Sequence, residues 1–318
     1  MIESKRIACI GAGLIGQGWA TCFAAKGCDV VLHDTSETVL ENAMQNVKSN
    51  LRVLAKNSPP GELDPDSAAG RIEPTADLAQ ACGQTGYIQE SVVEQYDAKK
   101  RVFAQIDASA PNGAIIASST SGLLMSEIQQ AAARPERCVL AHPYLPVHLI
   151  PLVEVAGGRQ TSPEALAATF ELMRKIGKTP VMLKREVPGF IVNRLQAALL
   201  REAIDLVDSG VADAEDVDRA FKLSSGLRSP FLGPLLRAHL AGDGIERFFE
   251  NYSGSYRARL ESMANWSAFP DRAVRAVTKS VNEMEMVRTK SLDEIKQWRD
   301  DMLAAILSVV NERPHISS

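Results

Sequence analysis

The sequence predicts an α/β protein in which an N-terminal, doubly wound parallel sheet is followed by an all-helical C-terminal domain. Up to residue 187, short apolar runs alternate with amphipathic helical stretches, which is the pattern of strands covered on both faces by crossover helices. After Pro188 and Gly189 the strand pattern stops, and the remaining sequence has mostly helical periodicity. We therefore expect two domains, at residues 1–187 and 188–318, with the boundary near residues 186–188.

The individual elements follow from the positions of the apolar runs. Short apolar runs predict buried strands, and longer stretches with one apolar face predict helices. The expected strands are residues 6–10, 30–34, 87–90, 114–118, 138–142, 152–155 and 180–183. The expected helices are residues 14–25, a longer helix capped by Ser36, helices between the three strands at 87–90, 114–118 and 138–142, residues 163–176 and residues 190–208, after which the helical signal continues to Asn311. Residues 57–66, rich in proline and acidic side chains, predict a loop.

The composition is that of an ordinary globular protein, and it excludes some classes of function. Of 318 residues, 45% are hydrophobic and 23% are charged, and the formal net charge is -4, so a nucleic acid or an anionic membrane is not an expected partner. No segment has the pattern of a membrane span or a secretory signal, which predicts a cytoplasmic protein. The five cysteines contain no CxxC pair, so we expect reduced thiols and no metal site.

A glycine-rich turn follows the first expected strand and opens the first expected helix. Gly11 permits a tight turn, Gly13 lets the backbone approach a pyrophosphate, and Gly16 lets the helix pack closely on the strand. Asp34, at the end of the next expected strand, can accept hydrogen bonds from a ribose diol and would repel a 2′-phosphate. These features predict a Rossmann domain that binds NAD rather than NADP. The expected contacts come from the turn itself and the start of its helix, at Gly11, Gly13, Leu14, Ile15 and Gly16.

A histidine and a glutamate lie in neighbouring apolar runs. His142 closes one expected strand, and Glu154 lies inside the next, where a carboxylate must be paired or have a shifted pKa. If the two strands are adjacent and end at one edge of the sheet, Glu154 can hold one imidazole nitrogen and leave the other to act as a general base. Oxidation of an alcohol by hydride transfer requires such a base. The alternative is a structural His–Glu pair without catalytic function.

Four runs of residues resemble motifs of the 3-hydroxyacyl-CoA dehydrogenase family, in the family's order and at nearly its spacing. They are ASSTSG at residues 117–122, AHP at 141–143, PLVEV at 151–155 and PGFIVNR at 188–194. Within the family, residues 87–91, 173–177 and 298–300 are most similar to the branch of lambda-crystallin and L-gulonate 3-dehydrogenase and to L-carnitine dehydrogenases. The resemblance covers nearly the whole chain.

The resemblance implies catalytic roles for four residues. His142 matches the family's catalytic base, and Glu154 matches the carboxylate that orients this base. Ser121 and Asn193 match the groups that hydrogen-bond the reacting oxygen of the substrate. Without the resemblance, Ser121 would be explained as a cap between strand and helix, and Asn193 as a polar residue early in a helix.

The resemblance also implies contacts with the cofactor and an assembly. Glu94 and Lys99 match positions that contact NAD in the family; without that contact, Lys99 would be a solvated charge on an exposed helix face. The helical domain is similar to a dimerisation domain, so we expect a homodimer. The substrate is expected between the two domains.

Four residues and one segment bear on the substrate. Arg228 matches an arginine of the gulonate and carnitine branches and is expected to bind a free substrate carboxylate, within one subunit or across a dimer interface; the alternative is a surface ion pair. Tyr144 and Phe231 are candidates for the aromatic cage that a trimethylammonium group would require. Leu145 departs from the family, which usually has an asparagine there, and one polar contact is therefore missing. Residues 58–66 are acidic where acyl-CoA enzymes are basic.

The expected activity is NAD-dependent oxidation of the 3-hydroxyl of a small 3-hydroxy acid to the 3-oxo acid, as in L-gulonate 3-dehydrogenase. Three alternatives stay open: an L-carnitine 3-dehydrogenase, a thioester-specific 3-hydroxyacyl-CoA dehydrogenase, and a crystallin-like structural protein that binds NAD without turnover. The set of Ser121, His142, Glu154 and Asn193 argues against the last of these.

Overall fold

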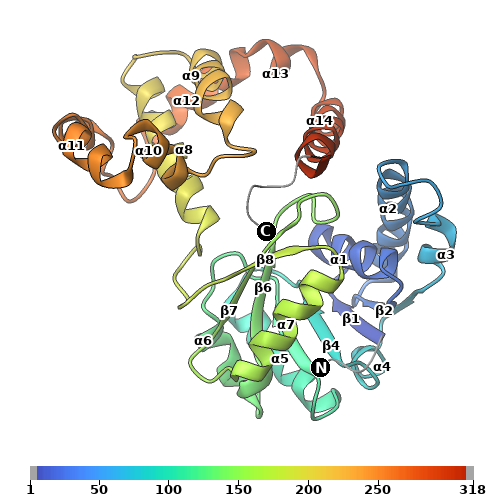
Figure 1. The fold of residues 1–318 in the computed structure, drawn as a ribbon. Helices are drawn as coiled ribbons and strands as arrows, with labels where there is room; N and C mark the ends of the chain where they lie inside the picture. Colours follow the sequence, from blue (N-terminus) through green and yellow to red (C-terminus); the bar gives the residue numbers. More distant parts are fainter. Residues whose placement is uncertain (1–5, 313–318) are drawn as a thin grey trace. The chain divides into compact units, whose positions relative to one another are not determined.

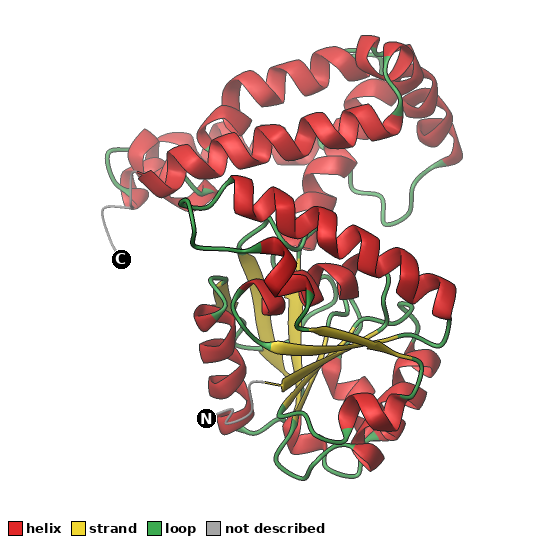
Figure 2. Ribbon diagram, turned by 90° about the vertical axis from the view of Figure 1, so that its right-hand side faces the viewer, coloured by secondary structure: helices red, strands yellow, loops and turns green. Residues whose placement is uncertain are grey.

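The computed structural model describes residues 6–312. The chain divides into two compact units, Met1–Arg194 and Leu195–Ser318. The first unit contains a Rossmann sheet with helices on both sides, and the second contains only helices among its described residues (Figures 1 and 2). The predicted fold class is confirmed. No helix within residues 6–312 has both the length and the apolar character needed to cross a bilayer.

One eight-stranded sheet forms the centre of the first unit, with the strand order β3-β2-β1-β4-β5-β6-β7-β8. Neighbouring strands are parallel except for β6 and β7, which are antiparallel. The strands are β1 (Arg6–Ile10), β2 (Asp29–His33), β3 (Ile72–Thr75), β4 (Tyr87–Glu90), β5 (Ile115–Ser118), β6 (Cys138–Pro143), β7 (Leu152–Gly157) and β8 (Thr179–Met182).

Helices cover both faces of this sheet because alternate strand residues point to opposite sides. On one face, Cys9 and Leu32 pack in a core with residues of α1, α2 and α7. On the other face, Ala8 and Ile88 pack with residues of α4, α5 and α6. The helices of this unit are α1 (Leu14–Ala25), α2 (Glu37–Lys56), α3 (Pro65–Ala69), α4 (Leu78–Cys82), α5 (Tyr96–Ser109), α6 (Met125–Ile128) and α7 (Pro163–Lys175).

Several sequence expectations need correction. The predicted sheet was wholly parallel, but β7 runs against β6. Strand β3 and helix α4 lie in a stretch to which the sequence pattern assigned no element, and α3 overlaps the end of the predicted loop. Strand β2 ends at His33, so Asp34 follows the strand instead of closing it. The predicted helix at 190–208 begins only at Val192, because Phe190 has a φ of 51°, which is not helical.

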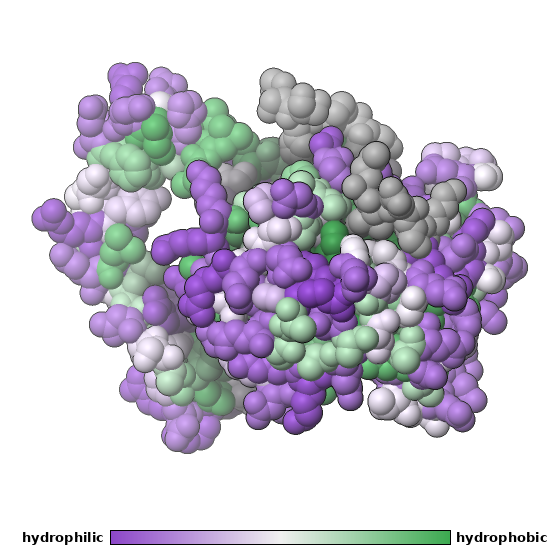
Figure 3. Space-filling view, turned by 90° about the horizontal axis from the view of Figure 1, so that it is seen from below, coloured by the Kyte–Doolittle hydropathy of each residue, from purple (hydrophilic) through white to green (hydrophobic). Residues whose placement is uncertain are grey.

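The second unit contains helices with few buried side chains. Large apolar side chains remain exposed on several helices, including Leu235 at 80% and Leu223 at 70%, whereas the buried apolar residues of this unit's described part are Ile204 and three alanines. Figure 3, which views the molecule from below Figure 1, shows hydrophobic side chains interspersed among hydrophilic ones on the surface seen from that side. The elements from here on are α8 (Val192–Asp208), α9 (Ala214–Phe221), a π-helix (Lys222–Gly226), α10 (Pro234–Ala241), α11 (Ile245–Ser262), α12 (Asp271–Glu283), α13 (Glu285–Thr289) and α14 (Leu292–Glu312).

Candidate active site

The glycine turn joins β1 to α1 with the geometry of a dinucleotide-binding loop. Gly11 has a φ of 93°, and a Cβ on it would lie 2.7 Å from the carbonyl oxygen of Ser91. A Cβ on Gly16 would lie 1.7 Å from the carbonyl oxygen of Gly11, whereas a Cβ on Gly13 would meet no atom within 4 Å. The backbone is therefore tightly packed at Gly11 and Gly16 but open at Gly13, which leaves room for a pyrophosphate beside Gly13.

The start of α1 and the end of β2 complete the expected NAD site. No side chain caps the N-terminus of α1, so its first N–H groups are available to phosphate oxygens. Asp34 accepts hydrogen bonds from the backbone N–H groups of Ala12 at 2.9 Å and Ser36 at 3.2 Å. This carboxylate is thus fixed beside the glycine turn, where a ribose diol would need its acceptor. The residues present fit NAD.

His142 and Glu154 are brought together by the pairing of β6 with β7. The two residues lie directly opposite each other in the antiparallel ladder, so their side chains are on the same face of the sheet. The Nδ1 atom of His142 is 3.0 Å from Oε2 of Glu154. The predicted contact is present, but the expected cause was wrong: the strands do not end at a common edge, and Glu154 lies in the middle of β7.

Glu154 is a buried carboxylate whose charge is balanced by four donors. Its side chain is 1% exposed. Oε2 accepts from His142 and from the hydroxyl of Tyr144 at 2.6 Å, and Oε1 accepts from the backbone N–H groups of Ile191 at 2.8 Å and Val192 at 3.1 Å. Burial raises the pKa of Glu154, but these hydrogen bonds outweigh it and hold the pKa below its ordinary value. The carboxylate is therefore ionised near neutral pH and can stabilise an imidazolium.

Two aromatic rings fix the orientation of the imidazole. The ring of Tyr144 meets that of His142 edge-on, with 4.6 Å between centroids, and the ring of Phe190 lies 5.5 Å away. Phe190 is 1% exposed. The other imidazole nitrogen, Nε2, has no hydrogen-bond partner among the described residues, so it is free to exchange a proton with a substrate.

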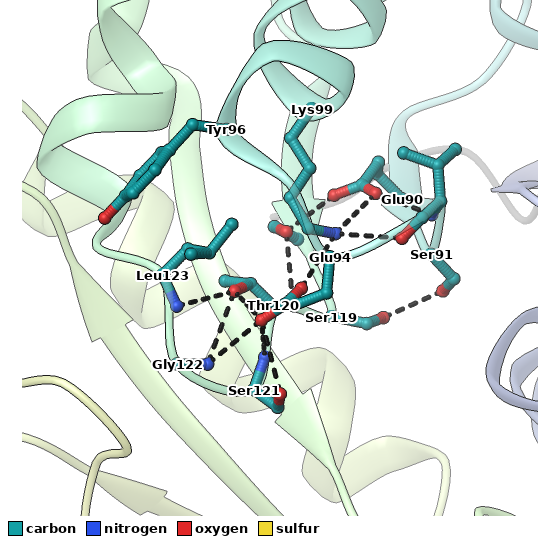
Figure 4. A network of polar contacts seen from close by, with 12 residues as sticks. Glu90, Ser91, Glu94, Tyr96, Lys99, Ser119, Thr120, Ser121, Gly122 and Leu123 are labelled. Carbon is teal, nitrogen blue, oxygen red and sulfur yellow. Dashed lines mark hydrogen bonds and ion pairs between the residues drawn. The ribbon is translucent and has the colours of Figure 1, made fainter. Parts of the chain in front are cut away.

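Glu94 holds the loop that carries Ser121 (Figure 4). Its Oε1 atom accepts from the hydroxyl of Thr120 at 2.6 Å, from the N–H and hydroxyl of Ser121 at 2.8 and 3.2 Å, and from the N–H of Gly122 at 3.1 Å. Burial raises the pKa of Glu94, but the Thr120 bond, the Lys99 charge and the two N–H groups bring it below its ordinary value. In this structure Glu94 organises the loop around Ser121; its predicted contact with NAD stays a prediction.

Lys99 is a buried cation, so the alternative of a solvated charge on an exposed helix face is wrong. Its side chain is 1% exposed, and its Nζ atom lies 2.8 Å from Oε1 of Glu90 and 3.4 Å from Oε2 of Glu94. Glu90 is itself fully buried. This chain of charges, visible in Figure 4, joins the end of β4 to the Ser121 loop. These two ion pairs hold Lys99, the residue that the resemblance assigns to the cofactor site, in place.

A cavity of about 420 Å³ is lined by six of the predicted site residues, whereas the four residues Gly11, Gly13, Leu14 and Gly16 of the glycine turn, and Asp34 and Arg228, are not among its lining residues. The amide of Asn193 donates to the backbone carbonyl of Ser121 at 2.9 Å, so these two residues are neighbours as the resemblance implied. Glu154 lies behind His142 instead of in the wall. The lining residues are Ile15, Ser91, Val92, Glu94, Lys99, Ser119, Ser121, His142, Pro143, Tyr144, Leu145 and Asn193.

Arg228 lies in the second unit, beyond the π-helix. Its Nε atom donates to the carbonyl of Ser224 at 3.3 Å. No acidic side chain of the described chain pairs with this guanidinium, so the alternative of an intramolecular surface ion pair has no support. Its role in binding substrate stays a prediction.

Sequence reasoning missed two contacts in this site. The bond from Tyr144 to Glu154 has no sequence signal, because a tyrosine hydroxyl can bond to many neighbours. The Glu90–Lys99 pair did have one: Glu90 ends a wholly buried strand, and a lysine follows nine residues later.

Comparisons with known proteins agree with the geometry of the site. A family model of the NAD-binding domain of 3-hydroxyacyl-CoA dehydrogenase matches residues 6–187, and a model of that family's C-terminal domain matches residues 189–280. An L-carnitine dehydrogenase from a Pseudomonas species is 36% identical over 309 residues, which cover 96% of this chain and 94% of the relative. Lambda-crystallin from Oryctolagus cuniculus is 33% identical over 295 residues, or 92% of each chain.

Solved structures of dehydrogenases are also similar to this chain. The NAD-dependent 5-formyl-3-hydroxy-2-methylpyridine 4-carboxylic acid 5-dehydrogenase is similar over 98% of this chain and 100% of its own, with a TM-score of 0.82 and 28% identity. The (S)-3-hydroxybutyryl-CoA dehydrogenase PaaH1 from Ralstonia eutropha is similar over 88% of this chain and 93% of its own, with a TM-score of 0.66 and 28% identity. The chain belongs to the 3-hydroxyacyl-CoA dehydrogenase family and is an NAD-dependent hydroxyacid dehydrogenase.

Proposed function

We propose that this dehydrogenase oxidises the 3-hydroxyl of a small 3-hydroxy acid that carries a free carboxylate and no CoA. The observation that carries the chemistry is His142, backed by the buried Glu154, in the wall of a cavity that Ser121 and Asn193 also line. A sugar acid of the L-gulonate type is our first candidate, because the sequence resembles the branch that contains lambda-crystallin and L-gulonate 3-dehydrogenase, and a lambda-crystallin is 33% identical to this chain.

In the proposed reaction, a secondary alcohol and NAD⁺ give a ketone, NADH and a proton. When bound, NAD⁺ supplies the acceptor for the hydride that leaves C3 of the substrate. Nε2 of His142 takes the hydroxyl proton as the C–O double bond forms, and Glu154 stabilises the resulting imidazolium through Nδ1. Asn193 donates to the oxygen the amide hydrogen that is not bonded to the Ser121 carbonyl, and Ser121 donates by turning its hydroxyl from Glu94 to the substrate as negative charge develops there. In the reverse direction the imidazolium returns the proton to a 3-oxo acid.

The preference for a free acid is supported by Arg228. A guanidinium without an acidic partner can bind a carboxylate through two parallel hydrogen bonds. The Arg228→Ala variant is expected to lower kcat/KM for 3-hydroxy acids by about ten- to a hundredfold, the loss of one charge-assisted contact. Activity with a 3-hydroxyacyl-CoA should not fall. Arg219→Ala is the matched control, because Arg219 pairs with Glu215 on the surface of α9. Unchanged activity of Arg228→Ala on free acids would contradict the assignment.

L-carnitine is the second candidate substrate, and it belongs to the same chemical class. The relatives that are 36% identical to this chain bear the name L-carnitine dehydrogenase. Tyr144 lines the cavity and supplies one aromatic face for a trimethylammonium group. Ser229 departs from the carnitine branch, which has an aromatic residue at the matching position, whereas Leu145 departs from the family as a whole and bears on both candidates.

One assay separates these candidates. Purified enzyme is incubated with NAD⁺ and, in turn, L-gulonate, 3-hydroxybutyrate, L-carnitine and 3-hydroxybutyryl-CoA, and NADH formation is followed by absorbance. We expect the highest kcat/KM with a CoA-free acid. The thioester as the best substrate would overturn the proposal, and NADH binding without turnover of any 3-hydroxy or 3-oxo compound would favour a structural crystallin-like protein.

We also propose that the enzyme is a homodimer. The second unit exposes many large apolar side chains while burying few, and a helical unit of this kind needs a partner surface to become stable. A second copy is the partner that the family resemblance implies. Sedimentation equilibrium tests this, since a monomer across the accessible concentration range would refute it.

The proposed location is the cytoplasm. The five cysteines are free thiols, and four of them are buried. Thiols persist in this state in a reducing compartment. Localisation of a tagged full-length chain would test the proposal.

A further inference from the structure

One carboxylate oxygen serves both the imidazole and a phenol in this site. Oε2 of Glu154 lies 3.0 Å from Nδ1 of His142 and accepts the hydroxyl of Tyr144 at 2.6 Å. The phenol bond is the shorter of the two. Tyr144 also packs edge-on against the imidazole. A change at the phenol therefore reaches the imidazole through the shared oxygen.

The other oxygen of Glu154 cannot absorb such a change. Oε1 is occupied by the backbone N–H groups of Ile191 and Val192 at the start of α8. These donors are part of the chain and do not titrate. The carboxylate therefore accepts four hydrogen bonds, and the division of its charge between ring and phenol is decided at Oε2.

The remaining charged groups around the imidazole are paired elsewhere. The titratable side chains that line the cavity are Glu94, Lys99, His142 and Tyr144. Glu94 is engaged with Lys99 and with the Ser121 loop, and Lys99 is also bound to Glu90. Neither the Glu94 carboxylate nor the Lys99 ammonium makes a hydrogen bond or ion pair with His142 or Tyr144 among the described residues.

We propose that Tyr144 is a positioning residue that sets the pH range of catalysis by sharing Oε2 of Glu154 with His142. Its hydroxyl withdraws part of the carboxylate's charge from the imidazole, so the protonated ring is stabilised less than it would be by an unshared carboxylate. Burial and the bond to Glu154 raise the pKa of Tyr144, which keeps the phenol protonated and able to donate. The proposal rests on the proposed function, because it requires His142 to be the base.

The test is Tyr144→Phe, which removes the hydroxyl and keeps the ring against the imidazole. Oε2 then serves His142 alone, and the protonated ring is favoured. In the oxidation direction, which needs a neutral imidazole, the acid limb of kcat/KM moves to higher pH, so activity falls about three- to tenfold on that limb and is unchanged on the alkaline plateau. In the reduction direction, which needs the imidazolium, activity extends to higher pH by the same displacement. NADH affinity stays at the wild-type value.

Two variants separate the possible failures. Tyr96→Phe is the matched control: this half-buried phenol accepts a bond from the N–H of Leu124 and does not contact Glu154, so its pH profiles should keep their midpoints. His142→Ala tests the proposed base itself. If His142→Ala is inactive while Tyr144→Phe leaves both pH profiles in place, only the role of Tyr144 is lost. A uniform loss in Tyr144→Phe at every pH with a raised KM also overturns it, because that is the signature of direct substrate contact or of a displaced Asn193, whose backbone N–H bonds to the phenol. An active His142→Ala removes both proposals.

Discussion

Glu154 and Glu94 organise two sides of one cavity, and they do so with different kinds of partner. Glu154 is 1% exposed in its side chain and is bonded to a ring that can gain and lose a proton. Glu94 is 40% exposed and is bonded to hydroxyl and backbone groups of the Ser121 loop, with Lys99 as its counter-ion. Each carboxylate accepts four hydrogen bonds, so the number of bonds does not distinguish them.

The difference lies in what happens when protons move. A carboxylate that faces an imidazole takes part in proton transfer, because its charge is in balance with the charge of the ring. A carboxylate that faces hydroxyl and N–H groups fixes a loop and keeps the same partners at every pH near neutrality. Glu154 is therefore expected to act on the chemical step, and Glu94 on the placement of Ser121.

The largest expected effect comes from removing the titrating partner. His142→Ala should lower kcat by about 10³- to 10⁴-fold, which is the upper range for loss of a general base. NADH affinity, measured by fluorescence titration, should change less than about threefold, because the glycine turn and Asp34 are separate from the ring. A large loss of NADH affinity in this variant would mean that His142 supports the cofactor site. Glu154 could then no longer be assigned to proton transfer through His142.

A smaller effect is expected when each carboxylate is replaced by its amide. Glu154→Gln should lower kcat by about a hundredfold, because the imidazolium loses its counter-charge, and should displace the pH profile. Glu94→Gln should lower kcat/KM by less than about tenfold, since only the Ser121 loop is loosened, and should leave the midpoints of the profile in place. Steady-state kinetics over a pH series measures both. If the pH profiles of the two variants moved by the same amount, Glu154 and Glu94 would not differ in their effect on proton transfer.

The smallest expected effect is on acid stability. The pKa of each glutamate is below its ordinary value in the folded state, so each contributes stability above the unfolded pKa of about 4.5 and loses it as pH falls through the folded value. Urea unfolding between about pH 6 and about pH 3 should therefore show a shallower loss of stability in either glutamine variant than in wild type. A steeper loss of stability in either variant would show that the pKa of that glutamate is not lowered in the folded state.

The sequence predicted the parts of this protein that are encoded by local pattern. The short apolar runs located most strands of the sheet, and the spacing of the glycines located the NAD turn. The position of Glu154 inside an apolar run predicted that its carboxylate pairs with His142. Strand direction was not predictable in this way, because an apolar run has the same pattern in either direction; β7 was therefore placed the wrong way round. The four-residue strand β3 carries only one fully buried residue, Ile72, and gave no signal.

The hydrogen-bond and ion-pair partners of the site residues were the other feature that the sequence did not predict. Glu94 and Lys99 were singled out by resemblance, yet their bonds to the Ser121 loop and to Glu90 depend on which segments meet in three dimensions. The hydroxyl of Tyr144 is the clearest case, since nothing in its neighbours along the chain points to Glu154. Such contacts arise from tertiary packing, which a single sequence does not display.

The hairpin-like pairing of β6 with β7 has a consequence for how this enzyme can change. His142 and Glu154 are cross-strand partners, so the backbone ladder sets the separation of the two residues, while the Tyr144 hydroxyl and the N–H groups of Ile191 and Val192 hold the carboxylate. The length of the connection from Leu145 to Pro151 does not set that separation, provided that the ladder keeps its register and Tyr144 keeps its bond to Glu154. A slip of one residue, in contrast, would turn one partner to the opposite side of the sheet. Selection or engineering can thus vary the connecting loop for new substrates while the proton-transfer machinery is inherited intact.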